Sequence, residues 1–159
     1  MKIGIIVHSK SGNTYSVIEG IQEKLVQRGH DVKIERIQTE GEENLNEVDP
    51  TKIHLGTIPD VSQYDGVILA APVRAFSISP ILGAYLTHIS SLENKKVACL
   101  VTQFLPFPQM GGKRAINQIK QACKSKGAII AGTAIVNWTH PKREAKIVSA
   151  IEIISKLFG

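Results

Sequence analysis

The chain has 159 residues, 43% of them hydrophobic, which is enough for one globular domain to bury a core without disulfide bonds. The longest apolar run, 128–136, is too short to cross a bilayer, and no cleavable signal pattern follows Met1, so we expect neither membrane insertion nor export. Cys99 and Cys123 lack metal-type spacing and fall at core-facing positions, which favours a reduced, cytoplasmic setting.

Charge is distributed unevenly along this chain of formal net charge +5. Residues 95–146 hold ten Lys and Arg and a single acid, Glu144, whereas residues 35–65 hold eight of the 14 acids. The basic half could attract an anionic partner through its field, or it could simply be the solvated faces of helices. No nucleic-acid recognition motif is present and no aromatics interleave with the basic residues, so we expect no nucleic-acid partner.

Strand-like and helical patterns alternate along the chain, beginning with a nearly continuous apolar run at 2–8 that is typical of a strand buried on both faces. Apolar residues then recur at helical spacing over 14–28, and Gly29 stands where a left-handed cap would end that helix. Val32 and Ile34 alternate with charged residues, which indicates a half-buried strand at the edge of a sheet.

Three more apolar runs have strand character, and they cover 67–71, 97–101 and 128–136. Ser79 and Pro80 predict the N-cap and first turn of a helix between the first two runs. Helical spacing returns over 116–127 and 147–157, with Pro141 near the start of the last helix. Helices therefore separate the strands throughout the second half of the chain.

This alternation predicts one α/β domain over residues 1–159, with helices on both faces of a five-stranded parallel sheet. The three-layer sheet is doubly wound, and the edge-like second strand indicates the order 2-1-3-4-5. Segment 38–64 does not fit the pattern, because it is polar and acidic and has no sustained apolar period. Residues 59–64 could form a short helix. Loops this long either serve a function or are partly disordered, and the sequence leaves both readings open.

Three loops meet where the predicted strands end, which is the edge at which open parallel sheets bind ligands. These loops are 9–14, 72–77 and 102–112. The first reads Ser-Lys-Ser-Gly-Asn-Thr and runs into a helix, so its hydroxyls, its backbone amides and the helix dipole could hold one phosphate. It has neither Walker nor dinucleotide spacing. The same residue types also occur in turns that only cap a helix.

The first loop resembles the T/S-x-T/S-G-N-T phosphate loop of flavodoxins, and residues 64–86, YDGVILAAPVRAFSISPILGAYL, resemble the flavodoxin-like quinone reductases. The resemblance covers most of the chain and is weakest over 38–59. It implies a flavodoxin-like fold with FMN as the cofactor. The loop residues that would surround the FMN phosphate are Ser9, Lys10, Ser11, Gly12, Asn13 and Thr14.

The same resemblance places the isoalloxazine ring between the other two loops. The residues expected at its N5 edge are Pro72, Val73, Arg74, Ala75 and Phe76, and those expected at its pyrimidine side include Thr102, Gln103, Phe104, Phe107 and Gly111. Three phenylalanines, Phe76, Phe104 and Phe107, could stack on the ring or could be ordinary core residues. Unlike flavodoxins, this chain has no glycine at 73–76, so a peptide flip beside N5 would be less free.

Electron transfer through FMN is the function that the resemblance implies. A carrier would exchange electrons with a redox partner protein, whereas an enzyme would take hydride from NAD(P)H and reduce a quinone-like acceptor. Arg74 and the basic half could favour the anionic nucleotide. A rival reading is a flavodoxin-like scaffold that binds phosphate or a partner protein and has no redox role, and a homo-oligomer is left open.

Other chemistries find little support in the sequence. The five histidines have no ligand spacing, and no nucleophile motif occurs, so we expect no metal and assign no catalytic residue. His8 stands next to the first loop, and we interpret it as a structural residue. A receiver domain would need acidic residues where this chain has His8-Ser9 and Ala71-Pro72.

Overall fold

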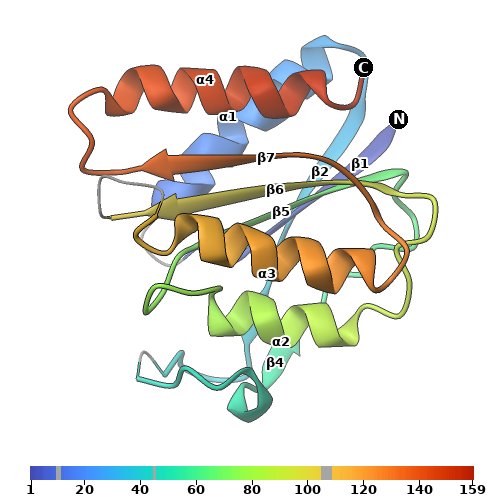
Figure 1. The fold of residues 1–159 in the computed structure, drawn as a ribbon. Coiled ribbons are helices and arrows are strands. Elements are labelled where there is room, and N and C mark those ends of the chain that lie inside the picture. The colour runs from blue at the N-terminus through green and yellow to red at the C-terminus, as the bar shows by residue number, and fades with distance from the viewer. Residues whose placement is uncertain (10–11, 45, 105–108) are drawn as a thin grey trace.

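A computed structural model describes residues 1–9, 12–44, 46–104 and 109–159. Its centre is a sheet of five parallel strands in the order β2-β1-β5-β6-β7 (Figure 1). The strands are β1 (Lys2–Val7), β2 (Asp31–Arg36), β5 (Gly66–Pro72), β6 (Lys96–Gln103) and β7 (Ile129–Asn137). When only these five strands are numbered in chain order, the sheet has the order 2-1-3-4-5. The predicted order is therefore confirmed.

Two helices cover each face of the sheet and complete the three predicted layers. In Figure 1, α1 (Asn13–Gln27) and α4 (Arg143–Lys156) lie above the sheet, and α2 (Pro80–His88) and α3 (Gly112–Lys124) lie below it. Two apolar clusters fill the space between the layers. Along β1, Ile5 faces the α1 and α4 side and Ile6 faces the other, which explains why the run at 2–8 is apolar at nearly every position.

The edge strand of the sheet and the ends of two helices lie where the local sequence predicts them. Strand β2 lies at one edge of the sheet and is half-exposed, as its alternating pattern predicted. Gly29, with a φ of 90°, lies just beyond the end of α1. Ser79 caps α2 by accepting a hydrogen bond from the Leu82 amide at 3.4 Å, and Pro80 is the first helical residue.

Segment 38–64 replaces a crossover helix with a small antiparallel pair, β3 (Gln38–Thr39) and β4 (Leu55–Thr57), and a 3₁₀ turn, η1 (Pro50–Lys52). The short helix considered at 59–64 is wrong. The Asp60 carboxylate accepts a hydrogen bond from the Ser62 amide, and this side-chain contact competes with helical bonding there. The segment packs on α2, where the Tyr85 hydroxyl donates to the Pro59 carbonyl at 2.5 Å.

Both cysteines are reduced and fully buried, as expected of core residues. Burial raises the pKa of both thiols, that of Cys123 to about 12, so neither is a reactive thiolate at neutral pH. None of the described helices has the length and apolar composition that a membrane span requires.

Candidate functional site

The three predicted loops lie at one edge of the sheet because all five strands are parallel. The loops follow β1, β5 and β6, and Figure 1 shows the ends of β6 and β7 at the same side as the first turns of α3 and α4. Helix starts gathered at one edge direct several positive dipole ends toward it. This edge therefore combines backbone amides, side chains from three loops and a field that favours anions.

The first loop has the features of a phosphate site. The Ser9 side chain is buried, and its hydroxyl has no hydrogen-bond partner within the described part of the chain. Gly12 takes a left-handed φ of 86° at the start of α1, and the space where a Cβ would stand is open to 4 Å. Asn13 is the first helical residue. An unpaired buried hydroxyl beside a helix start fits a bound phosphate oxygen.

Arg36, which the sequence did not single out, supports this loop from the end of β2. Its Nη2 donates to the Ser9 carbonyl at 3.1 Å, and its guanidinium carbon lies 4.9 Å from the centre of the Tyr15 ring. The arginine thus ties the loop to both β2 and α1. Of the other predicted loop residues, Thr14 is buried, whereas Lys10 and Ser11 fall outside the described residues.

The second loop contains a tight turn whose central residues have an unfavourable backbone conformation. Arg74 and Ser77 exchange two backbone hydrogen bonds of 3.0 Å each, as in a two-residue hairpin. Ala75 and Phe76 have φ values of 50° and 59°. Turns of this kind normally use Asn and Gly, and a left-handed conformation costs other residues about 1 kcal/mol or more each. The turn therefore needs support from its surroundings.

The second and third loops touch at Gly111, which precedes α3. Its φ is 107°, and a Cβ there would stand 2.7 Å from the Phe76 Cα and 2.9 Å from the Val73 Cγ1. Beside this contact is a hollow of about 150 Å³. The lining residues are Val73, Ala75, Phe76, Gln103, Phe104 and Met110. The loops thus meet at a glycine, because the space between them holds the hydrogen atom of Gly111 but not a Cβ atom.

Aromatic side chains at this hollow face solvent rather than the core. Phe76 is 58% exposed and Phe104 is 73% exposed, so core packing does not account for either ring. Exposed phenylalanines of this kind are available to a flat ligand. Pro72 ends β5, and Thr102 and Gln103 end β6 as buried residues. Phe107, the third predicted stacking residue, falls outside the described residues.

A partly buried polar network joins the end of β1 to the acidic segment and the second loop. The Oε1 of Glu43 lies 2.9 Å from the His8 Nε2 and 2.9 Å from the Arg74 Nη2. On its other side, the His8 Nδ1 lies 2.9 Å from the Ser79 hydroxyl. Both ring nitrogens of His8 are therefore satisfied, which supports its interpretation as a structural residue.

Charge states in the network follow from these contacts. Burial is the main reason that the pKa of His8 lies below its usual value. Burial alone would raise the pKa of Glu43, but the hydrogen bonds from Arg74 and His8 and the charge of Arg74 lower it overall. At neutral pH the network thus contains an ionised Glu43 between a cationic Arg74 and a neutral His8.

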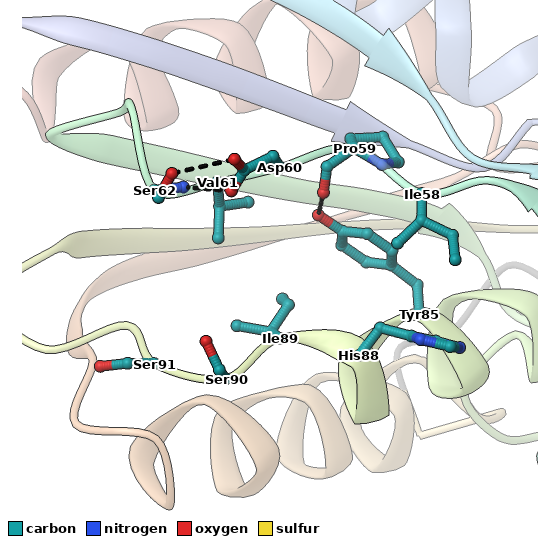
Figure 2. Close-up of a pocket in the computed structure, with 10 residues that line it drawn as sticks. All are labelled: Ile58, Pro59, Asp60, Val61, Ser62, Tyr85, His88, Ile89, Ser90 and Ser91. Atoms are coloured by element: carbon teal, nitrogen blue, oxygen red, sulfur yellow. Dashed lines mark hydrogen bonds between the residues drawn. The ribbon is translucent and has the colours of Figure 1, made fainter.

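A second hollow lies away from the three loops. Figure 2 shows it between residues 58–62 and the end of α2, with Tyr85 and His88 among the lining side chains. Its volume is about 200 Å³. Because α2 begins near the three loops and runs away from them, this hollow is at the other end of the helix. Two hydrogen-bonded contacts are drawn there: Tyr85 to Pro59 joins α2 to the segment before β5, and Ser62 to Asp60 closes a local turn.

A doubly wound sheet of this order, with a phosphate-type loop after its first strand and an aromatic hollow between the next two loops, defines a flavodoxin-like FMN-binding protein. The family model described as NADPH-dependent FMN reductase matches residues 1–141. The chain belongs to that family, its cofactor is FMN, and it takes part in electron transfer.

Solved structures share the fold over nearly the whole chain. The two-electron reduced flavodoxin of Megasphaera elsdenii is 20% identical with a TM-score of 0.67, covering 97% of this chain and 98% of that one. A flavodoxin of Streptococcus pneumonia TIGR4 is 15% identical with a TM-score of 0.71, covering 99% and 98%. An azoreductase of Bacillus anthracis is 12% identical with a TM-score of 0.67, covering 99% and 98%. A search of curated protein sequences found no significant match.

Proposed function

We propose that this chain holds FMN across the three loops and acts as an NAD(P)H-dependent reductase of a small, flat acceptor such as a quinone. The observation that carries the proposal is the hollow between the second and third loops, where Phe76 and Phe104 face solvent. Because this hollow is open, a flavin ring held in it keeps one face accessible to a nicotinamide or quinone ring. The description of the family supports NADPH as the donor.

The phosphate of FMN lies at the first loop in this proposal. Donors come from Asn13 at the start of α1, from Thr14 and from the Ser9 hydroxyl, which has no partner among the described residues. Gly12 leaves room in front of the helix. Lys10 and Ser11 complete the loop in the sequence. Arg36 acts indirectly, because it holds the Ser9 carbonyl and orients the loop backbone.

The ring of FMN lies between the second and third loops, with 72–76 at the N5 edge and 102–112 at the pyrimidine side. When bound, FMN supplies the redox chemistry, since it exchanges electrons singly or in pairs. The chain contributes position: Phe76 and Phe104 offer faces for stacking, and the rigid turn at Arg74 fixes backbone groups beside the ring.

The first test is retention of added FMN after free cofactor is removed, followed by NADPH oxidation with a soluble quinone. Bound flavin with quenched fluorescence and quinone-dependent oxidation of NADPH support the reductase. A colourless protein that takes up no FMN at micromolar concentration would instead support the non-redox scaffold.

A second measurement tests the phosphate assignment. Ser9→Ala should weaken FMN binding severalfold and leave riboflavin, which has no phosphate, unaffected. Ser149→Ala, on the exposed side of α4, is the matched control and should change neither affinity. Equal losses for both flavins would show that Ser9 does not act on the phosphate.

A carrier role is the second candidate, and the charge of α3 favours it. Lys113 and Arg114 are exposed in the first turn of this helix, where cations oppose the macrodipole, and the helix contains no acidic residue. Such a surface beside the flavin loops suits an acidic redox protein. With a reduced acidic ferredoxin as donor, flavin reduction should slow at high salt and in Lys113→Glu, but not in Lys33→Glu on β2.

A further inference from the structure

The turn from Arg74 to Ser77 is fixed from both ends by side chains that are distant in sequence. Its central residues, Ala75 and Phe76, both have positive φ, although neither is a glycine. Strained backbone of this kind persists only where neighbouring groups determine the conformation. The contacts that do so come from the acidic segment and from α3.

Glu43 holds the Arg74 end of the turn. Its Oε1 accepts a hydrogen bond from the Arg74 Nη2 at 2.9 Å, and the two side chains are only 16% and 19% exposed. The same oxygen accepts from the His8 Nε2, and Ser79 completes the chain by donating to the His8 Nδ1. The carboxylate is therefore anchored, through His8 and Ser79, to the end of β1 and the start of α2 as well as to the arginine.

Gln118 holds the other end of the turn from the middle of α3. Its Oε1 accepts from the Ser77 hydroxyl at 2.9 Å and from the Ile78 amide at 2.8 Å. At the start of the same helix, Gly111 brings the backbone against Phe76. Both ends of the turn are thus tied to rigid elements rather than to each other alone.

We infer that Glu43 and Gln118 are positioning residues that clamp this turn in the conformation that receives the FMN ring. The inference rests on the proposed function, which places residues 72–76 at the ring's N5 edge. It gives segment 38–64 a role that its sequence did not reveal: Glu43 connects the acidic segment to the flavin site. Without the clamp the turn relaxes, and FMN must restore its conformation on binding.

The sign of the effect separates positioning from simple electrostatics. FMN is an anion, so removing the charge of Glu43 should tighten its binding if the carboxylate acts only through its field. Loss of the clamp should weaken binding, because binding must then order the turn. Glu43→Gln keeps the shape of the side chain but removes its charge, which weakens the hydrogen bond that it accepts from Arg74. One variant therefore tests the two opposite expectations.

The experiment is titration of the apoprotein with FMN, followed by quenching of flavin fluorescence. We expect Glu43→Gln to raise the dissociation constant about fivefold, because a neutral amide oxygen accepts the Arg74 hydrogen bond more weakly than a carboxylate does. Glu42→Gln, the exposed neighbouring acid, should match the wild type. Unchanged or tighter binding in Glu43→Gln would overturn the inference.

Gln118 provides an independent variant. Gln118→Met removes the acceptor at similar volume and should weaken FMN binding about fivefold, whereas Gln118→Glu retains the acceptor oxygen and should restore most of the affinity. Gln121→Met, an exposed change one turn along α3, is the control. If Gln118→Met binds FMN as the wild type does, α3 does not hold the turn.

A rescue experiment tests whether the effect passes through the turn. Glycine adopts positive φ without penalty, so Ala75→Gly should bring Glu43→Gln back to within about twofold of the wild-type affinity. Failure of this rescue would show that Glu43 acts by another route.

In the apoprotein, Glu43→Gln should also speed hydrogen exchange of the Ser77 amide, which bonds to the Arg74 carbonyl. A wild-type chain that binds no FMN would defeat the proposed function; normal wild-type binding with unaffected variants would defeat only the clamp.

Discussion

The Thr14 hydroxyl in the first turn of α1 lies 2.7 Å from the Thr102 hydroxyl near the end of β6. The two residues are 88 positions apart, and both are almost completely buried. This contact joins the loop assigned to the phosphate with the strand that leads into the third loop. One hydrogen-bonded pair of side chains therefore links the two ends of the proposed cofactor site.

Valine substitutions should reveal that pair through their non-additivity. Thr14→Val and Thr102→Val each leave one buried hydroxyl without its partner, so each should lower the free energy of unfolding by about 1–2 kcal/mol. The double variant leaves no orphaned hydroxyl and should lose clearly less than the sum of the two. Urea unfolding of the apoprotein measures the unfolding free energies of the wild type, the two single variants and the double variant. Strictly additive losses would show that the hydroxyls do not support each other.

Replacing Gly111 by alanine should be more costly than the same change at Gly29. Both glycines have positive φ, so alanine costs about 1 kcal/mol at either site through backbone conformation. At Gly29 the new methyl group would meet nothing within 4 Å, whereas at Gly111 it would stand 2.7 Å from the Phe76 Cα. The difference in unfolding free energy between the variants measures the contact between the loops. Equal losses would mean that the third loop moves away freely.

Ala75→Gly should stabilise the apoprotein. Glycine relieves the left-handed strain at a φ of 50°, and the gain exceeds the entropy that glycine adds to the unfolded chain, leaving about 0.5–1 kcal/mol. Ala84→Gly, a buried change within α2, is a contrasting control and should destabilise by at least about 1 kcal/mol. Thermal unfolding of both variants checks the prediction. A lower midpoint for Ala75→Gly would show that the turn is not strained.

Much of the fold was predictable because it follows from local pattern. Runs such as 2–8 are apolar at nearly every position because helices cover both faces of the sheet, and β2 alternates because it lies at an edge. Ser79 and Pro80 marked the start of α2 through capping chemistry alone. Once the strands are parallel, their carboxyl ends must share one edge, so the three loops of the site were also predictable.

The support of the site was not predictable, because it depends on long-range contacts. Glu43 is one of eight acids in its region, and only its partners, 35 and 31 residues away, distinguish it. Arg36 ends an edge strand, a position that usually points to solvent. The positive φ of Ala75 and Phe76 runs against their intrinsic preference, so no local rule indicates it.

Acidification should destabilise the chain in two steps that belong to His8 and Glu43. The pKa of His8 is lowered from 6.5, chiefly by burial, so below pH 6.5 the unfolded chain binds a proton that the folded chain does not. Stability is therefore complete above that pH and is lost as pH falls toward the folded pKa. The pKa of Glu43 is lowered from 4.5, so its contribution is present above 4.5 and is lost as pH falls through its folded value.

Single variants should separate the two steps in urea unfolding measured from pH 8 to pH 3. His8→Gln cannot take up the proton, so its unfolding free energy should fall less as pH drops below 6.5 than that of the wild type. Glu43→Gln should flatten the decline below pH 4.5. His88→Gln, an exposed histidine at the end of α2, should leave both slopes unchanged. If His8→Gln shows the wild-type slope just below pH 6.5, the buried imidazole does not control stability there, because it then takes up its proton equally in the folded and unfolded chains.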